Sequence, residues 1–189
     1  MRLKLLHLVS ICLVFCACNN TETLEASNVN LKLDNGVLYY NKTPFSGQLL
    51  SYYPNKNLKS EVQYYKGKKH GYEKHWFVDS ILREERYYIK GLKSGIHRGW
   101  WSRDSLKFEY HFNNKGEYNG SVKEWYKNGQ LFKQFNYLNG KEDGHQRLWK
   151  KNGDTKANYK VVNGERFGLI GLKKCYTCLL YTSPSPRDA

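Results

Sequence analysis

The sequence predicts an all-β protein of tandem β-hairpin repeats, each about 24 residues long, that form an elongated, twisted, solenoid-like antiparallel sheet. Regularly spaced glycines, hairpin turn signals and aromatic columns lead to this prediction. The glycines that open the units lie 24 or 25 residues apart, at Gly47, Gly71, Gly95, Gly120, Gly144 and Gly168. A second set lies four residues earlier, at Gly67, Gly91, Gly116, Gly140 and Gly164. A fixed period of this size is typical of repeats in which each unit stacks on the next.

The unit that opens at Gly120 shows the hairpin pattern most clearly. Asn128-Gly129 predicts a two-residue type I′ turn, which needs positive φ at both central residues, and Asn152-Gly153 repeats it. The run 131–137 alternates between a mostly apolar and a polar face, as a strand does. Each unit is therefore expected to be strand, tight turn and strand, followed by a connector such as 140–144. Three units lack a glycine in the turn: Asn55-Lys56, Asp79-Ser80 and Asp104-Ser105.

Large apolar residues recur in columns, which predicts a stacked core rather than a ligand platform. Five residues after each opening glycine stand Tyr52, Trp76, Trp100, Trp125 and Trp149, and seventeen after it stand Tyr64, Tyr88, Phe112, Tyr137 and Val161. The unit from Gly95 carries one extra residue. We place it late, because this keeps Leu106, Phe108, Tyr110 and Phe112 on one inner face. The expected core is thin, with one aromatic column on each face, so each unit depends on its neighbours.

The segments EWYKNGQLFKQFNYLNGKEDG and YYKGKKHGYEKHW resemble the MORN-variant repeat of bacterial proteins labelled YwqK-family antitoxins. The resemblance covers roughly Val37 to Cys175. It implies a β-hairpin scaffold and, for function, an antitoxin or immunity role in which the repeats sequester a toxin.

The first 17 residues predict an export signal. Arg2 and Lys4 precede an apolar run that is shorter than the roughly 20 residues a membrane span requires. The stretch 15–18 resembles a bacterial lipobox, which implies that Cys18 is lipidated; an ordinary cleaved signal is the alternative. Polar residues 18–30 are expected to form a flexible tether. The expected location is exported and lipid-anchored, with the outer membrane preferred because Asn19 gives no inner-membrane retention signal.

The other end of the chain departs from the repeat. Residues 178–189, CLLYTSPSPRDA, resemble a translated sequencing adapter, so we expect the repeat domain 31–177 to be truncated. Cys175 and Cys178 have the spacing of a redox or zinc pair, but the second cysteine falls in the adapter-like segment. Only Cys175 is then left in the predicted mature domain besides Cys18, so no internal disulfide is expected. A sixth unit cut after Gly168 would leave a strand edge that favours self-association.

The chain is strongly basic, with 31 Lys and Arg against 17 Asp and Glu and a formal net charge of +14. The lysines are spread over every repeat. They indicate either a solvated outer face or docking onto an anionic membrane or another polyanionic surface. Export argues against nucleic acid as a partner.

No arrangement of residues predicts catalysis, a cofactor or a metal. The histidines fall in different repeat positions, at His7, His70, His75, His97, His111 and His145, without a ligand pattern. No Gly-x-Ser-x-Gly elbow or phosphate-binding glycine loop occurs. We therefore expect a protein that is not an enzyme.

The candidate binding residues form a basic ladder three residues after the opening glycines, at Lys74, Arg98, Lys123 and Arg147. They are expected to project to the side opposite the aromatic columns. The alternative is that positions three and five share a face, so that the basic side chains pack beside the tryptophans. The predicted function is a lipid-anchored envelope scaffold whose extended sheet binds a protein, a glycan or an anionic surface; the alternative is the antitoxin role.

Overall fold

The structure, a computed structural model, describes residues 22–171. The predicted signal peptide, Cys18, Cys175 and the adapter-like segment 178–189 lie outside these residues, so those expectations stay predictions.

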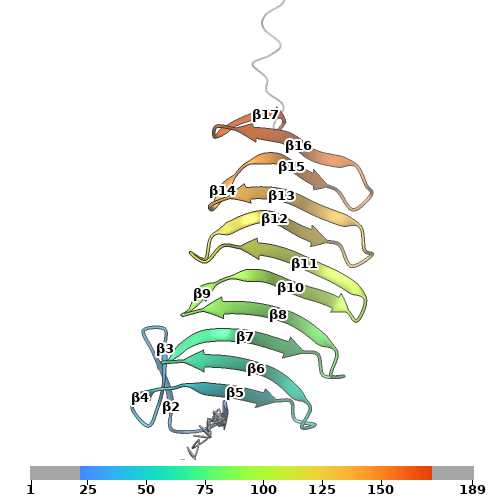
Figure 1. Cartoon of the computed structure of the whole chain (residues 1–189). Coiled ribbons are helices and arrows are strands. Elements are labelled where there is room, and N and C mark those ends of the chain that lie inside the picture. The colour runs from blue at the N-terminus through green and yellow to red at the C-terminus, as the bar shows by residue number, and fades with distance from the viewer. Residues whose placement is uncertain (1–21, 172–189) are drawn as a thin grey trace, which may run out of the picture.

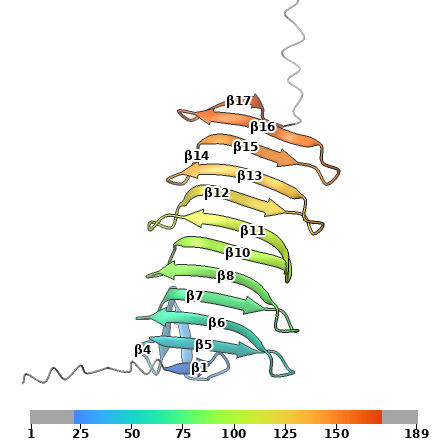
Figure 2. The same cartoon turned by 45° about the vertical axis from the view of Figure 1, so that its right-hand side comes forward.

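The fold is one long, open antiparallel sheet of consecutive hairpins (Figures 1 and 2). This confirms the predicted fold class. Its strands are β5 (Gly47–Tyr52), β6 (Leu58–Tyr65), β7 (Lys68–Trp76), β8 (Leu82–Ile89), β9 (Leu92–Lys93), β10 (Gly95–Ser102), β11 (Ser105–Phe112), β12 (Tyr118–Trp125), β13 (Leu131–Leu138), β14 (Lys141–Glu142), β15 (Gly144–Trp149), β16 (Thr155–Val162) and β17 (Glu165–Leu169), with β1 (Thr23–Glu25) added at one edge. A separate three-stranded sheet contains β2 (Leu31–Asp34), β3 (Val37–Tyr40) and β4 (Thr43–Pro44).

The N-terminal end differs from the expected tether. Thr23–Glu25 form β1, which pairs in parallel with β5, so the segment 18–30 is not a free linker throughout. The small sheet β2–β4 leads to Phe45, which is 2% exposed and whose carbonyl accepts a hydrogen bond from the Gly67 amide at 2.7 Å. Phe45 also packs on Tyr64. These contacts cover the first repeat, which has no preceding repeat to pack against.

Two kinds of turn alternate along the stack, and the predicted type I′ turn at Asn128-Gly129 is wrong. The Gly129 amide donates to the Tyr126 carbonyl at 3.0 Å, and only Gly129, with φ of 83°, has positive φ in this turn. This is a type I turn followed by one left-handed residue. The type I′ turns lie at the opposite edge, as at Asn139-Gly140, where φ is 48° and 80°.

The wider turn explains the units that lack a turn glycine. It needs positive φ at a single residue, which Lys56 supplies at 67° and Ser80 at 63°. The unit from Gly95 instead closes with a tight turn in which Ser102 pairs with Ser105. Its extra residue lies later, in the 113–117 turn after Phe112, which confirms the late placement.

Each hairpin contains a β-bulge near the turn that joins its two strands, and this bulge changes which residues share a face. In the second unit His75 pairs with Glu84 and Trp76 with Leu82, so Arg83 is skipped. Because side chains alternate along a strand, the remaining residues divide into two sets. The buried face carries positions two, thirteen, fifteen and seventeen after the opening glycine. The ladder face carries positions three and fourteen, with the basic ladder.

The core lies on the buried face. Its apolar members within the hairpin stack are Val62, Tyr88, Phe108, Phe112, Val122, Phe135, Ala157, Tyr159 and Val161, each 9% exposed or less. Rings from successive units contact one another: Tyr88 lies 5.4 Å from His97, His97 lies 4.6 Å from Phe112, and Phe112 stacks on Tyr118 at 4.7 Å. Each unit therefore completes the core of the next.

Hydrogen bonds also join the units at the edge with the wide turns. The residue after position five of one unit donates a side-chain hydrogen bond to the backbone carbonyl at position five of the next unit. The three pairs are Tyr53 to Trp76 at 2.8 Å, Trp101 to Trp125 at 3.0 Å and Tyr126 to Trp149 at 3.1 Å. The tryptophan column is thus tied into the stack through its backbone.

Residues 22–171 contain no helix that is long and apolar enough to cross a membrane.

Candidate functional site

The basic ladder is one part of a row of paired residues that runs across the strands of the ladder face. Each basic residue is flanked in register by position fourteen of its own hairpin and of the preceding one. In spatial order the row is Glu61, Lys74, Glu85, Arg98, Glu109, Lys123, Gln134, Arg147 and Asn158. The sequence prediction therefore identified a continuous row but only one of its two alternating components.

The first half of this row neutralises itself. Lys74 Nζ lies 3.2 Å from Glu85 Oε2, and Arg98 Nε donates to Glu109 Oε2 at 2.8 Å. Partial burial would raise the pKa of Glu109, but hydrogen bonds from Arg98 and His111 outweigh it and lower that pKa. Glu109 is therefore ionised, and its two oxygens already have Arg98 and His111 as partners.

The second half of the row carries amides in place of carboxylates. Gln134 and Asn158 stand opposite Lys123 and Arg147, at the position where Glu85 and Glu109 stand in earlier units. Lys123 keeps Glu109 as its neighbour on the other side, whereas Arg147 has an amide on both sides. Within residues 22–171 neither Lys123 nor Arg147 forms an ion pair. The nearby Glu124 belongs to the other face, where Lys133 Nζ lies 3.3 Å from its Oε1. We call Lys123, Gln134, His145, Arg147 and Asn158 the open half of the ladder.

Arg147 lies between two hollows on this face. One, of about 250 Å³, is lined by Gln134, Asn136, His145 and Arg147. The other, of about 230 Å³, is lined by Arg147, Trp149, Thr155 and Asn158. The guanidinium is thus surrounded by hydrogen-bonding groups that carry no negative charge, an arrangement that can receive an anion.

The tryptophan column shares the ladder face, and the expectation that the ladder projects to the opposite side is wrong. Each ladder residue precedes a tryptophan by two positions on one strand, and Arg147 and Trp149 line the same hollow. Trp76, Trp100, Trp125 and Trp149 are half-buried and Tyr52 is 43% exposed, so the column is not the core. The physical reason is the β-bulge, which leaves position five on the ladder face while positions thirteen, fifteen and seventeen lie on the buried face.

Sequence reasoning missed a buried acid on the other face. Glu73 is 8% exposed, and its Oε1 accepts from Lys69 Nζ at 2.7 Å and lies 3.1 Å from His75 Nε2. Burial alone would raise the pKa of Glu73, but hydrogen bonds from His75 and Lys69 lower it to about 2. This cluster is a closed ion-paired network, with its acceptor atom already occupied.

The histidines do not converge on a metal. Within residues 22–171 no group of three or more His, Cys, Asp or Glu side chains is arranged to hold an ion. His97 is 2% exposed, and its Nε2 lies 2.8 Å from the Tyr87 carbonyl. Burial lowers the pKa of His97, so the ring is neutral and donates this bond.

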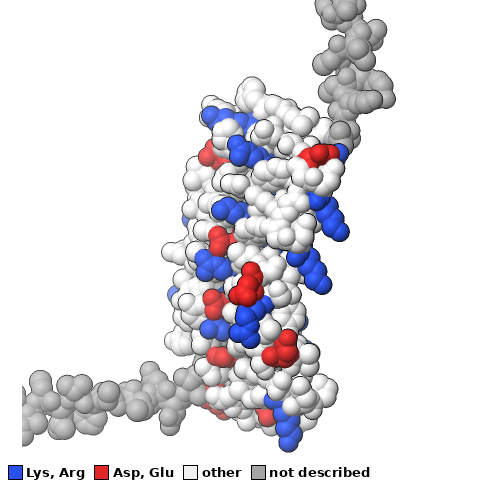
Figure 3. Space-filling model, turned by 90° about the vertical axis from the view of Figure 1, so that its right-hand side faces the viewer, with Lys and Arg blue, Asp and Glu red and all other residues white. Residues whose placement is uncertain are grey.

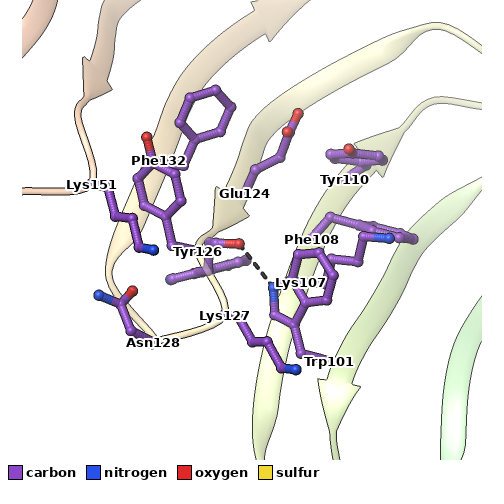
Figure 4. A pocket seen from close by; sticks show the side chains of 11 residues that line it. Trp101, Lys107, Phe108, Tyr110, Glu124, Tyr126, Lys127, Asn128, Phe132 and Lys151 are labelled. Carbon is purple, nitrogen blue, oxygen red and sulfur yellow. Dashed lines mark hydrogen bonds between the residues drawn. The ribbon is translucent and has the colours of Figure 1, made fainter.

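A second feature that sequence reasoning missed is an aromatic hollow of about 760 Å³ beside the tight turn (Figure 4). Trp101, Phe108, Tyr126 and Phe132 form part of its wall, and Lys107, Lys127 and Lys151 also line it. Its residues come from three successive units, which only the stacked structure brings together.

No protein family model matches this chain, and no curated protein matches its sequence.

Proposed function

We propose that this chain is a lipid-anchored repeat scaffold of the cell envelope that binds an anionic partner surface and catalyses no reaction. The observation that carries the proposal is the change from Glu85 and Glu109 to Gln134 and Asn158 along one row. Beyond Glu109 the cations continue along the row without further carboxylates. Arg147 has an amide on both sides, and the Glu109 carboxylate beside Lys123 is already hydrogen-bonded to Arg98 and His111. Both cations can therefore pair with charges supplied from outside the chain.

The single-layer sheet supports this role because every unit contributes the same repeat positions to the ladder face at the same spacing. Successive ladder residues lie on strands with one strand between them, a separation of about 10 Å. A partner that carries negative charges at similar intervals would contact Lys123 and Arg147 together. Lipidation of Cys18, as predicted from the lipobox, would supply the anchor.

Retention on a heparin column at increasing salt tests the proposal. The variant Lys123→Gln/Arg147→Gln is expected to elute at clearly lower salt than the unchanged chain, because each lost contact weakens polyanion binding. The control Lys115→Gln/Lys141→Gln removes the same charge from exposed connector positions. If both variants elute together, net charge alone governs retention and the ladder has no special role.

The antitoxin role remains the second proposal, and the resemblance to the MORN-variant repeat favours it. The same open half would then bind an acidic surface of a toxin. Such a protein protects cells that express the toxin, whereas an envelope scaffold gives no protection.

A further inference from the structure

The aromatic hollow lies on the buried face, close to the edge formed by the wide turns. Trp101 and Phe108 come from the third hairpin, Tyr126 and Phe132 from the fourth, and Lys151 from the turn of the fifth (Figure 4). Trp101 is held by its bond to the Trp125 carbonyl, and Tyr126 and Phe132 meet edge to face at 5.2 Å. The aromatic wall is therefore fixed before any ligand arrives.

The hollow coincides with a local change in the repeat. The third hairpin closes tightly at Ser102 and Ser105, whereas the next two hairpins have the wider turns 126–130 and 150–154. Lys127 and Lys151 occupy equivalent positions in these two wide turns, and both line the hollow. The irregular unit thus stands beside two regular ones whose turns carry lysine.

The charge of the hollow is positive. Lys127 and Lys151 are exposed, and within the described part of the chain neither forms an ion pair. Lys107 Nζ lies 4.6 Å from the centre of the Trp101 ring, so a third cation is next to an aromatic face. The one carboxylate that lines the hollow, Glu124, is already paired with Lys133. Figure 3 shows basic side chains projecting at several heights along this edge.

The backbone offers little for recognition here. Strands β11, β12 and β13 are hydrogen-bonded on both sides, so a peptide cannot add to the sheet as a further strand. A ligand must be recognised by aromatic faces and by lysine side chains. Pyranose rings pack their C–H faces on aromatic rings, and their carboxylates pair with ammonium groups.

We propose that the aromatic hollow binds an acidic glycan, a chain of sugar rings in which uronic acids recur. The wide turns that carry Lys127 and Lys151 are one repeat apart, which is about 10 Å, the length of roughly two sugar rings. A glycan with a carboxylate on every second sugar would therefore meet both lysines while its ring faces pack on the aromatic wall that includes Tyr126 and Trp101. This site lies on the face opposite the open half of the ladder and stands independently of it.

The test is isothermal titration of the full chain with a hexasaccharide in which glucuronate alternates with N-acetylglucosamine. Saturable binding is expected, with a change in tryptophan fluorescence because Trp101 lines the hollow. Lys127→Gln/Lys151→Gln is expected to weaken binding about tenfold, since two charge pairs are lost. Trp101→Leu is expected to weaken it at least as much. If that variant misfolds, the exposed lysine pair still decides the question.

Three controls make the result specific. The variant Lys115→Gln/Lys141→Gln removes the same charge elsewhere and is expected to bind normally. The variant Lys123→Gln/Arg147→Gln removes the ladder contacts and is expected to keep the binding event that Lys127→Gln/Lys151→Gln weakens, which separates this site from the proposed ladder site. The neutral N-acetylglucosamine hexamer is expected to bind much more weakly.

The proposal is overturned if the acidic hexasaccharide does not bind, or if the neutral hexamer binds equally well. Equal weakening by the Lys115/Lys141 variant would also overturn it. Hexaglutamate that displaces the sugar and binds more tightly would identify an acidic peptide site instead.

Discussion

Replacing Glu73 by glutamine tests whether the buried ion-paired cluster stabilises the sheet. Glu73 is 8% exposed and accepts from Lys69 at 2.7 Å. Its pKa is lowered from 4.5 to about 2, so the charged form is favoured in the folded state. A shift of this size corresponds to about 3 kcal/mol of stability at neutral pH. Because glutamine retains one acceptor oxygen, we expect Glu73→Gln to lose about 2–3 kcal/mol in the free energy of unfolding.

The dependence on pH provides the sharper measurement. A carboxyl with a lowered folded pKa contributes its full stabilisation above the unfolded value, near 4.5, and loses it as the pH falls through about 2. The difference in stability between the unchanged chain and Glu73→Gln should therefore be largest near pH 7 and shrink steadily below pH 4.5. Urea unfolding followed by tryptophan fluorescence at several pH values measures it.

The matched control is Glu85→Gln, which breaks the more exposed pair with Lys74 at 3.2 Å on the other face. An ion pair of this kind contributes at most about 1 kcal/mol. The reasoning is refuted if both variants lose the same stability at pH 7, or if the Glu73 difference does not change with pH.

Two further stability predictions follow from single buried contacts. Burial lowers the pKa of His97 below 6.5, so the unfolded chain binds a proton that the folded chain does not. The free energy of unfolding should therefore fall as the pH drops below 6.5. Urea unfolding at several pH values should show a weaker dependence of stability on pH for His97→Gln. Gly99→Ala should cost about 1–3 kcal/mol in thermal unfolding, because its methyl group would overlap the Phe108 ring, and Phe108→Leu in the same chain should recover part of the loss. Gly99 does not have a positive φ, so alanine there adds no backbone strain. A Gly99→Ala loss that Phe108→Leu does not reduce would remove the steric explanation.

The stack of hairpins was predictable because regularly spaced glycines and turn residues are local signals. The type of each turn was not. Asn128-Gly129 and Asn139-Gly140 are the same dipeptide, yet only the second forms a type I′ turn. The difference lies in strand register: the first turn sits beside a bulge that accommodates one more residue, and a local pattern does not contain this information.

The assignment of faces failed for a related reason. Lys74 and Trp76 must share a face because they are two residues apart on β7, but the column looked like core by composition. The buried residues lie on the far side of the bulge from the turn. Arg83 is skipped there, and positions thirteen, fifteen and seventeen form the core instead. The aromatic hollow was out of reach of sequence reasoning altogether, since Trp101 and Lys151 are separated by two repeats.

The open half of the ladder was visible in the sequence as Gln134 and Asn158, but its meaning needed the register. Only the pairing of position three with position fourteen shows that Arg147 has amides on both sides and Lys123 an amide on one side, where Lys74 and Arg98 have carboxylates on both sides. The net charge of +14 does not say where on the surface the basic residues lie. The register and the ion pairs show that, within the described part of the row, the cations without an ion-pair partner are Lys123 and Arg147.

The buried position two residues after the opening glycine shows why these repeats are not interchangeable. It holds Glu73, His97, Val122 and Gln146, four side chains with different polar requirements. Each polar one has its own partners, most of them from the preceding unit: Lys69 and His75 bond Glu73, the Tyr87 carbonyl bonds His97, and Gln146 bonds both backbone groups of Asn136 at 2.9 and 2.8 Å. Moving any polar one of these side chains into a neighbouring unit would leave a buried polar group unpaired, which costs about 1–3 kcal/mol. The order of the units is therefore constrained by the core itself, and that order keeps the ladder residues with amide partners together at one end of the sheet.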